Sequence, residues 1–595
     1  MIRYFLLCLT IAVLFIIPMN LSKGSFHDAE NLPVACNGRF CSMESAARQW
    51  LYDFYHAQHL KKTDLTAFDV TESSAVNLLW MIHLQGHDKW DNAPFFWVRY
   101  AQLKSDLQLP LKEDRFSFHV LKGKINGASS NEMQELTHRL NTFDGYVGNR
   151  NSQDEAYALL YLQLEQQGVT PDKIGKTLEN SFPLPSRLRD AGTTLKMLPL
   201  RAKPGEWVSL HALEKKVYDP ETKLMVKIKN FTSFSDADYG KLQKAYFSLV
   251  GNNDVRSFSK AYEEAYETIA AKPYRQASGK ALYYPSMLRL KAETFYYKTP
   301  LIEMAIAFYA IALALMLMTK PRALSFGIAA LLTGFIIHSS VLALRCYILQ
   351  RPPVSNMFET VVYVPWVALL IGWIFYLSSR SRIILGAAAF TSLILLVLLK
   401  LTQVDARFEN VQAVLDSQYW LIIHVLMVVG SYGAFAICGI LGHVYLINSL
   451  MKKKTQDGKG ILHTMYFGVA LLIPGTILGG VWAAESWGRF WDWDPKESWA
   501  FITACVYLLV IHAYTFHRIK DFGLAVGAVA GLLAVSFTWY GVNYILGTGL
   551  HSYGFGSGGE TIYFIYVAAE CLFLISVGFL RNRKDRFICG DSPSS

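Results

Sequence analysis

The sequence has few charged residues and none of the short motifs by which common soluble enzymes are recognised. Asp, Glu, Lys and Arg make up 17% of its 595 residues, whereas hydrophobic residues make up 52%. No P-loop, Gly-x-Ser-x-Gly, His-Glu-x-x-His or Rossmann fingerprint occurs. The net charge of +10 is not arranged as a basic stripe or a nucleic-acid-reading module, so the sequence argues against nucleic-acid binding.

Cysteine is also scarce, with eight residues in the whole chain. No Cys-x-x-Cys-His occurs, so the chain does not carry covalent haem by the usual attachment motif. The polar segment 23–298 contains just Cys36 and Cys41. Outside the cytosol this spacing predicts a small structural disulfide, which we favour over a working redox pair.

Long apolar runs are what the sequence has in abundance, and each is long enough to cross a bilayer. We predict nine spans in residues 299–583, near 301–318, 324–346, 360–378, 383–402, 419–449, 463–484, 499–517, 522–546 and 561–580. Alternating these spans from an external start places the basic clusters at 380–382, 452–454 and 581–584 in the cytoplasm. The same alternation leaves residues 584–595 as a cytoplasmic tail.

The N-terminal residues 1–22 contain one further apolar run, which is either a cleaved signal peptide or a membrane anchor. Its length and the lack of a clear cleavage site favour the anchor. Residues 23–298 contain no spanning run and form an extracytoplasmic domain, with helices expected near 45–59, 131–140, 154–167 and 258–271 and a strand-like stretch at 224–229. The fold class is therefore a polytopic α-helical membrane protein with a mixed, mainly helical extracytoplasmic domain.

The most informative segment, Trp487–Glu497, is an external loop between two of these apolar runs. It contains Trp487, Trp491 and Trp493 within seven residues. Tryptophan is common at membrane–water interfaces. Its interleaving with carboxylates here favours instead a surface for a flat, aromatic, charged ligand, and a porphyrin fits that description.

The charged residues of the same loop suit such a ligand. Arg489 and Lys496 are candidates to bind propionates, because arginine grips carboxylates bidentately and lysine supplies a cation. Asp494 and Glu497, together with Asp492, either orient histidines or fix the loop through hydrogen bonds. The alternative is a solvated acidic rim with a turn at Asp494-Pro495.

Two histidines lie on the same external side as the tryptophan loop. His424 lies about five residues into the fifth predicted span, and His551 lies in a glycine-rich loop between the last two spans. Two neutral imidazoles from opposite sides can ligate one haem iron while indoles pack on the macrocycle. The alternatives are an interfacial histidine that bonds a neighbouring helix and a surface-loop histidine without a role.

Two more histidines lie deeper in predicted spans. His512 lies roughly 20 Å of helical rise below the outer end of its span. It is either a hydrogen-bonded residue of the helix bundle or a ligand to haem held within the membrane. His338 lies at a different depth, so the pairing of these two is a hypothesis only. Arg345 and Arg351, at the outer end of the second span, are further propionate candidates or snorkel to lipid phosphates.

These motifs resemble a known family. Trp487–Glu497 resembles the tryptophan-rich "WWD" signature, with the Trp-Asp-Pro-Lys-Glu-Ser ending of the CcsA/ResC cytochrome c biogenesis family. Arg351-Pro-Pro-Val-Ser-Asn-Met-Phe-Glu359 looks like the family's Pro-x-Ser-Asn-x-x-Glu loop. Gly541-Val-Asn-Tyr-Ile-Leu-Gly-Thr-Gly-Leu-His551 resembles its last external histidine motif. The resemblance covers residues of about 320–580.

The resemblance implies a role for each motif. His424 and His551 would be external axial ligands of haem b, and His512 would be one ligand of a transmembrane haem site. Trp487, Trp491 and Trp493 would be the haem platform. Fused synthases of this family carry a preceding CcsB/ResB-like half with several spans and a partner histidine. Here one span without histidine precedes the domain, so His338 or a separate CcsB/ResB-like protein would complete the site.

The function expected from these features is that of a cytochrome c haem lyase, or synthase, in a bacterial inner membrane. It would move haem to the periplasmic face and attach it through thioether bonds to an apocytochrome Cys-x-x-Cys-His segment, with thiol-reducing proteins as further partners. The alternatives are a haem exporter or chaperone that serves a separate ligase, and a b-type electron carrier. Carriers usually pair histidines at matched depths, a pattern that the sequence does not contain.

Overall fold

The chain divides into two compact units in the computed structural model. One comprises Met1–Ile17 and Pro300–Ser595, here called the membrane unit, and the other comprises Pro18–Thr299, here called the inserted unit. The structure describes residues 2–19, 26–36, 38–68, 70, 74–85, 90–98, 100–125, 131–145, 195–201, 207–213, 216–219, 224–227, 232–275, 281–318, 320–402, 406–408, 418–451, 453, 458–546 and 560–589.

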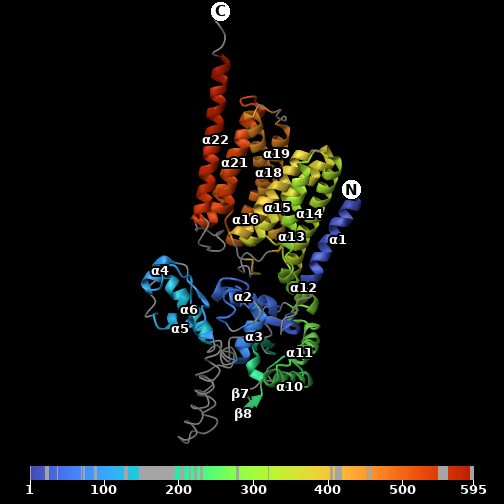
Figure 1. Cartoon of the computed structure of the whole chain (residues 1–595), viewed down its shortest axis with the longest axis vertical. Helices are drawn as coiled ribbons and strands as arrows, with labels where there is room; N and C mark the ends of the chain where they lie inside the picture. Colours follow the sequence, from blue (N-terminus) through green and yellow to red (C-terminus); the bar gives the residue numbers. More distant parts are fainter. Residues whose placement is uncertain are drawn as a thin grey trace, which may run out of the picture. The chain divides into compact units, whose positions relative to one another are not determined.

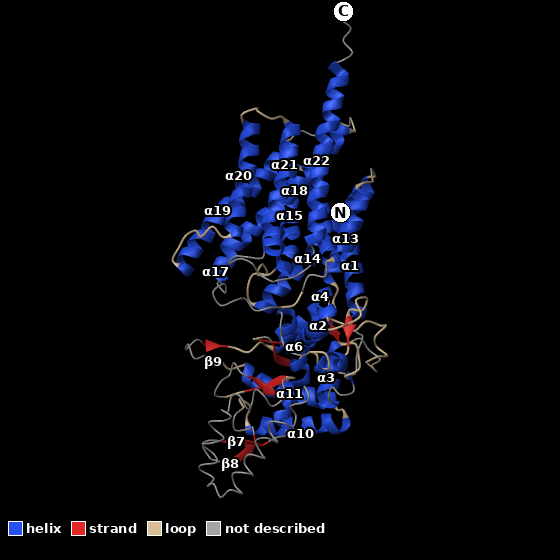
Figure 2. Cartoon of the chain, turned by 90° about the vertical axis from the view of Figure 1, so that its left-hand side faces the viewer, coloured by secondary structure: helices blue, strands red, loops and turns tan. Residues whose placement is uncertain are grey.

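All the regular secondary structure among the described residues of the membrane unit is helical (Figures 1 and 2). Its helices are α1 (Ile2–Met19), α13 (Leu301–Met316), α14 (Pro321–Leu349), α15 (Met357–Ser379), α16 (Arg382–Leu401), α17 (Gln418–Trp420), α18 (Leu426–Leu450), α19 (Lys459–Trp487), α20 (Pro495–Thr515), α21 (Asp521–Ser536) and α22 (Glu560–Cys589). Two π-helical segments, η7 (Leu421–Val425) and η8 (Phe537–Leu546), precede α18 and follow α21.

Eight helices among the described residues are long and apolar enough to cross a membrane, and a ninth is reached if α13 is counted together with α12 (Met287–Lys298). The polytopic helical class predicted from the sequence is therefore confirmed. Helix α1 has 18 residues but is not one of the eight, because its described apolar stretch is the shorter Arg3–Val13. Its Tyr4 packs against Phe326 of α14.

Helix ends in the membrane unit follow local sequence signals. Helix α14 begins with Pro321, whose missing N–H costs nothing in a first turn. Asn356 caps α15 by accepting a hydrogen bond from the Glu359 N–H. At the other end of α15, Arg380 takes a left-handed conformation and Ser381 caps α16. Two residues therefore suffice to turn the chain back between two spans.

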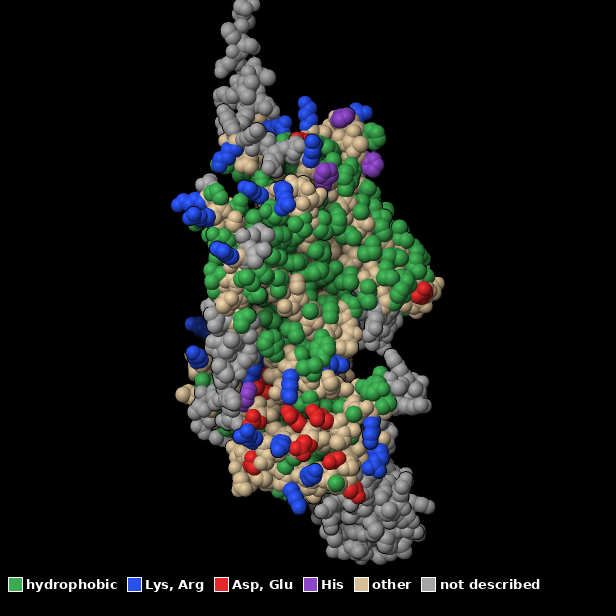
Figure 3. All heavy atoms as spheres, turned by 90° about the vertical axis from the view of Figure 1, so that its right-hand side faces the viewer, with side chains coloured by type: hydrophobic (Ala, Val, Ile, Leu, Met, Phe, Trp, Pro, Cys, Tyr) green, Lys and Arg blue, Asp and Glu red, His purple; other side chains and the backbone are tan. Residues whose placement is uncertain are grey.

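Helix α18 lies at the centre of the bundle and contacts α15, α16, α19, α21 and α22. Its span is 67% buried within the chain, whereas that of α22 is 11% buried. Hydrophobic side chains cover a broad face of these helices, with Lys, Arg and His side chains gathered at one end (Figure 3). Such a surface is what a lipid environment requires of a helical protein.

The inserted unit combines short hairpins with helices around an aromatic core. Its five hairpins are each two-stranded and antiparallel within the described residues: β1 (Pro33–Cys36) with β2 (Arg39–Ser42), β3 (Phe96–Trp97) with β4 (Arg115–Phe116), β5 (Lys196–Pro199) with β6 (Trp207–Ser209), β7 (Lys216–Asp219) with β8 (Leu224–Lys227), and β9 (Tyr274–Arg275) with β10 (Ala281–Leu282). Among its helices are α2 (Met43–Tyr55), α3 (Ala75–Gln85), α4 (Ala101–Asp106), α5 (Phe118–Lys122), α6 (Asn131–Gly145), α10 (Asp236–Asn252), α11 (Val255–Ala270) and α12.

Three of the four helices predicted from periodicity are present as α2, α6 and α11, and the strand-like stretch is β8. The fourth predicted helix, 154–167, lies outside the described residues. The core that these elements enclose is rich in tryptophan, tyrosine and phenylalanine, with Trp80 and Trp90 both fully buried. Rings of this size bury a large apolar area for each residue ordered, which suits a unit built from short elements.

The first hairpin contains both cysteines of the inserted unit. Cys36 and Cys41 lie diagonally across β1 and β2 and share one face of the hairpin, because Cys36 pairs with Arg39 and Val34 pairs with Cys41. Both residues carry thiols, and the two thiols are hydrogen-bonded to each other. The pair is therefore in contact, but the disulfide favoured from the sequence is not formed in this structure.

Candidate functional site

A pocket opens in the membrane unit at the end where α15, α18 and α20 begin and α19 and η8 end. It is lined by Val354–Met357, Thr360, His424, Val425, Val428, Val429, Tyr432, Thr476, Gly479, Gly480, Trp482, Trp491, Lys496, Glu497, Ala500, Trp539 and Asn543. It holds about 1130 Å³ of empty space, part of it open to solvent.

His424 borders this pocket from the π-helical segment Leu421–Val425. Its Nδ1 lies 2.7 Å from the carbonyl oxygen of Gly475. A carbonyl oxygen can only accept, so Nδ1 carries the proton and Nε2 carries the lone pair. Histidines that bind metals are commonly oriented in this way by a backbone carbonyl.

Glycine on α19 allows the imidazole to come this close. A Cβ on Gly479 would lie 2.4 Å from Cε1 of His424 and 2.9 Å from its Nδ1. A Cβ on Gly475 would lie 2.9 Å from Cγ2 of Val428. Both separations are far below contact distance, so larger residues would push α19 away from the start of α18 and displace the His424 ring.

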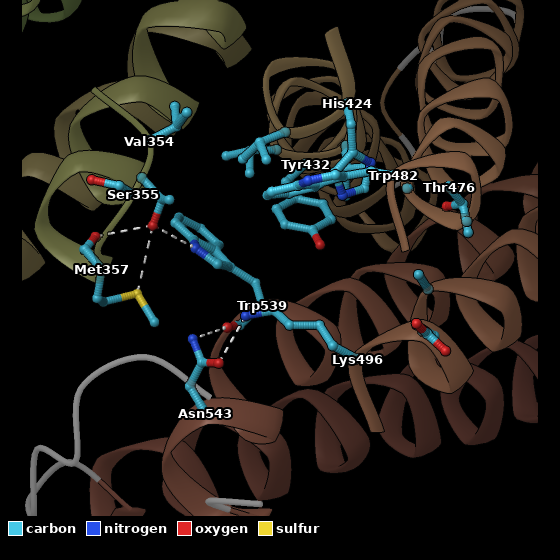
Figure 4. A pocket seen from close by; sticks show the side chains of 18 of the residues that line it. Val354, Ser355, Met357, His424, Tyr432, Thr476, Trp482, Lys496, Trp539 and Asn543 are labelled. Atoms are coloured by element: carbon cyan, nitrogen blue, oxygen red, sulfur yellow. Dashed lines mark hydrogen bonds between the residues drawn. The ribbon is translucent and has the colours of Figure 1, made fainter. Parts of the chain in front are cut away.

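Aromatic side chains form much of the pocket wall. The Trp482 ring meets His424 edge-on at 5.9 Å between centroids. Trp539, on the second π-helical segment, donates from Nε1 to the Thr360 hydroxyl at 3.1 Å and packs against Tyr432. Figure 4 shows His424, Trp482 and Tyr432 on one side of the pocket and Val354, Ser355 and Met357 on the other, with Trp539 between them.

The tryptophan loop supplies one indole to the pocket rather than three. Trp491 is a lining residue. Trp487 packs instead on the small cluster of Trp420 and Trp482. Trp493 has a positive φ of 55° and is 73% exposed, with its ring edge-on to Trp491. The described pocket thus takes Trp482 and Trp539 in place of two of the tryptophans predicted from the signature.

Some charged residues of the tryptophan loop cap helix α20, and others line the pocket. Asp494 caps α20 by accepting from the Lys496 N–H, with Pro495 at the first helical position. Lys496 lines the pocket, and its Nζ donates to Oδ1 of Asn543 at 2.7 Å. Glu497 also lines the pocket, and its carboxylate accepts from the N–H of Asp492.

Arg489 lies outside the lining and makes an exposed ion pair with Asp492. Exposed pairs of this kind contribute little to stability. Of the two cations proposed from the sequence for propionates, the structure therefore brings Lys496 to the pocket and leaves Arg489 at its exterior.

The Pro-x-Ser-Asn-x-x-Glu loop is built around a buried ion pair. Glu359 and Arg345 are both 0% exposed, and their side chains meet at 2.8 Å. The second carboxylate oxygen of Glu359 accepts from the backbone N–H and the hydroxyl of Ser355. Arg345 thereby holds the loop that forms the pocket wall at 354–357, and it does not itself line the pocket.

The remaining predicted histidines lie elsewhere. His338 is 1% exposed, and its two ring nitrogens meet the Tyr309 hydroxyl at 3.0 Å and the Val362 carbonyl oxygen at 2.9 Å. His512 is exposed on α20, with Nδ1 donating to the Leu508 carbonyl of its own helix. The structure does not bring these two histidines together in one site. His551 lies outside the described residues.

Sequence reasoning missed Trp482, Trp539, Asn543 and the glycines of α19 as parts of the site. Trp482 and Trp539 lie inside apolar runs, where a tryptophan is expected as an ordinary residue of a transmembrane helix. The two π-helical segments were also unforeseen. Such segments are rare and frequently lie at functional sites, and here they carry His424, Trp539 and Asn543 to one cavity.

The segment that contains the pocket is similar to known proteins. Residues 354–551 match the family model described as cytochrome C assembly protein. The chain is 29% identical over 286 residues to the cytochrome c biogenesis protein CcsA of Trachelium caeruleum, covering 40% of this chain and 89% of that protein. It is 32% identical over 245 residues to CcsA of Nicotiana tomentosiformis, covering 34% of this chain and 77% of that protein.

The chain belongs to the CcsA family of cytochrome c biogenesis proteins. It is also 34% identical over 232 residues to the protein NrfI of Wolinella succinogenes, covering 37% of this chain but spanning only 25% of NrfI. Every residue that lines the pocket lies within the segment 354–551 matched by the family model. The pocket therefore lies within the part of the chain that matches the family.

Proposed function

We propose that the pocket binds haem at the extracytoplasmic face of a bacterial inner membrane and presents it for attachment to apocytochrome c. The observation that carries the proposal is His424, whose imidazole is oriented by the Gly475 carbonyl at the wall of an indole-lined cavity. Its Nε2 lone pair would bind the iron of haem b, and Trp482, Trp491 and Trp539 would pack on the macrocycle.

The second axial ligand in this proposal is His551, in the glycine-rich segment of the sequence between η8 and α22. Lys496 would bind a propionate, because its ammonium group lies at the pocket and is held by Asn543. Glycines around His551 suit a ligand that the histidine of an incoming Cys-x-x-Cys-His segment displaces. Trp487 and Trp493 would support Trp491 from the exterior of the pocket, with Arg489, Asp494 and Glu497 fixing the loop.

Attachment itself needs little beyond positioning. Each cysteine thiol adds across one vinyl group: the sulfur bonds to a vinyl carbon and the proton goes to the other carbon, so the addition consumes no oxidant or reductant. A bound haem and a bound peptide react as if at very high local concentration. We propose that the chain is a haem lyase of this kind, and that thiol-reducing proteins keep the apocytochrome cysteines as thiols.

The transmembrane step would use His512. Its side chain is exposed on α20, so its partner ligand would come from outside this chain, and a CcsB/ResB-like subunit is the partner we propose. His338 is a weaker candidate as partner, because iron binding there would break a hydrogen bond to Tyr309 or to the Val362 carbonyl.

An absorption spectrum of the purified protein tests the external site. We expect a low-spin haem signal in the wild type and its loss in His424→Ala and in His551→Ala. His517→Ala is the matched control, because His517 is an exposed histidine at the opposite end of α20, and its spectrum should equal that of the wild type. A full low-spin signal in His424→Ala would overturn the proposal.

A second experiment separates a lyase from the alternative, a haem exporter or chaperone that serves a separate ligase. The chain is co-expressed with an apocytochrome c in a host without its own maturation system. Covalent haem on the cytochrome supports the lyase. Free haem at the extracytoplasmic side without covalent product supports export.

A further inference from the structure

The first hairpin of the inserted unit, β1 with β2, contains two cysteines whose thiols differ in exposure. Cys36 ends β1 beside the exposed turn residue Gly38 and is half-buried, whereas Cys41 is 0% exposed. The two sulfur atoms are hydrogen-bonded to each other. A turn with Gly38 at a φ of 75° brings the strands back on themselves at this point.

A buried cation lies beside both thiols. Arg39 is adjacent to the turn, and its guanidinium lies close enough to interact electrostatically with Cys36 and Cys41. Its Nη2 is held by the Glu293 carboxylate at 2.5 Å, and that carboxylate also accepts from the Ser42 N–H. The cation is thus fixed in place by α12. The Glu293 carboxylate also acts on Cys41, where its repulsion of a thiolate is smaller than the attraction of Arg39.

The two thiols differ in exposure and in how firmly they hold their protons, as disulfide exchange requires. The hydrogen bond to Cys36 and burial both raise the pKa of the Cys41 thiol well above its ordinary value. Cys41 therefore keeps its proton and donates it toward the Cys36 sulfur. The Cys36 thiol donates to Oε1 of Gln49 at 3.4 Å, and this hydrogen bond is lost when the thiolate forms. The nearby Arg39 cation and the Cys41 thiol would then stabilise the thiolate, as expected for an attacking cysteine with a buried resolving partner.

We propose that Cys36 and Cys41 form a working thiol–disulfide exchange pair, with Cys36 as nucleophile and Cys41 as resolving thiol, which reduces disulfides in extended peptides. The peptide class follows from the placement of Cys36 at the end of β1, next to the turn whose Gly38 is exposed. That the peptide is an apocytochrome rests on the proposed function; the exchange activity does not.

The reaction balances without any further group on the chain. The Cys36 thiolate attacks one sulfur of the peptide disulfide, and the other peptide sulfur leaves and is protonated. Cys41 then loses its proton and attacks the Cys36 sulfur, which releases the second peptide thiol. The peptide gains two electrons and two protons, the pair becomes a disulfide, and an external dithiol reduces it again.

The test uses the full-length protein with every other cysteine replaced by alanine, namely Cys8, Cys346, Cys438, Cys505, Cys571 and Cys589. The probe is a synthetic peptide with a Cys-x-x-Cys-His segment oxidised to its internal disulfide. Cys41→Ser should accumulate a dithiothreitol-sensitive adduct with the peptide at least tenfold faster than Cys36→Ser. With both cysteines present, the reduced protein should convert the peptide to its dithiol in stoichiometric amount.

Three results would overturn the proposal: equal trapping by the two single variants, no trapping by either, and a Cys36–Cys41 disulfide that a large excess of dithiothreitol leaves intact, which would mark a structural crosslink. Circular dichroism of each variant verifies that it is folded. The haem spectrum of the double variant Cys36→Ser/Cys41→Ser should equal that of the wild type. Failure of the exchange pair and failure of the haem site are therefore separate outcomes.

Discussion

Two polar regions of the membrane unit, the cluster around His338 and Arg345 and the pocket around His424, use the same residue types in opposite ways. In the cluster, His338 and Arg345 are 1% and 0% exposed, with both imidazole nitrogens and the guanidinium hydrogen-bonded inside the bundle. In the pocket, the Gly475 carbonyl orients His424, and the ring borders the cavity. Polar groups enclosed within a span must be bonded internally, so the cluster stabilises the fold. The pocket is the place where we propose that a ligand binds.

The largest expected effect is a loss of protein stability on mutation of the cluster around His338 and Arg345. Arg345→Met leaves the buried Glu359 carboxylate without its cation, which should cost about 3–5 kcal/mol. Thermal unfolding in detergent measures the loss. Arg322→Met, at an exposed position on the same helix, is the control and should change little. A double variant Arg345→Met/Glu359→Leu should recover much of the lost stability. If it does not, the ion pair stabilises the fold by more than the neutralisation of its two charges.

His338→Leu tests whether the second histidine of the cluster belongs to the fold or to haem. The substitution removes the hydrogen-bond partner of the buried Tyr309 hydroxyl. It should destabilise the protein by about 1–3 kcal/mol, because the desolvation of a buried polar group is then no longer compensated by a hydrogen bond. Removing both partners, as in Tyr309→Phe/His338→Leu, should be nearly neutral. The haem spectrum should stay unchanged in both variants. A lost haem signal in a folded His338→Leu protein would move this residue into the ligand set.

A smaller effect is expected at the pocket, where Gly479→Ala acts mainly on ligand binding. The new Cβ would lie 2.4 Å from the His424 ring, so the imidazole must move and haem affinity should fall about tenfold, or about 1.4 kcal/mol. Alanine is the better helix former, which offsets part of the cost of moving the ring, so the loss of stability should be smaller than in Arg345→Met. Gly386→Ala, whose Cβ would have one neighbour at 4.0 Å, is the matched control. Equal haem titrations for the two variants would contradict the proposed ligand geometry.

Several features of the site followed from the sequence alone. The apolar runs predicted the helices, because a bilayer core demands long apolar stretches. Alternation then brought Glu359, His424 and the tryptophan loop to one end of the bundle. The partners of these residues did not follow. Trp539 is separated from Thr360 by 179 positions, and a contact of that range leaves no local pattern for periodicity to detect.

The sequence by itself determined that the chain crosses a membrane several times, which end holds its polar loops, and which family it belongs to. The tertiary structure decided which residues of the tryptophan signature meet the cavity and which only support it. It also decided that His338 is enclosed while His424 borders open space. Composition and spacing act along the chain, whereas the glycine contacts, the π-helical segments and the buried ion pair that set these differences arise only where helices pack together.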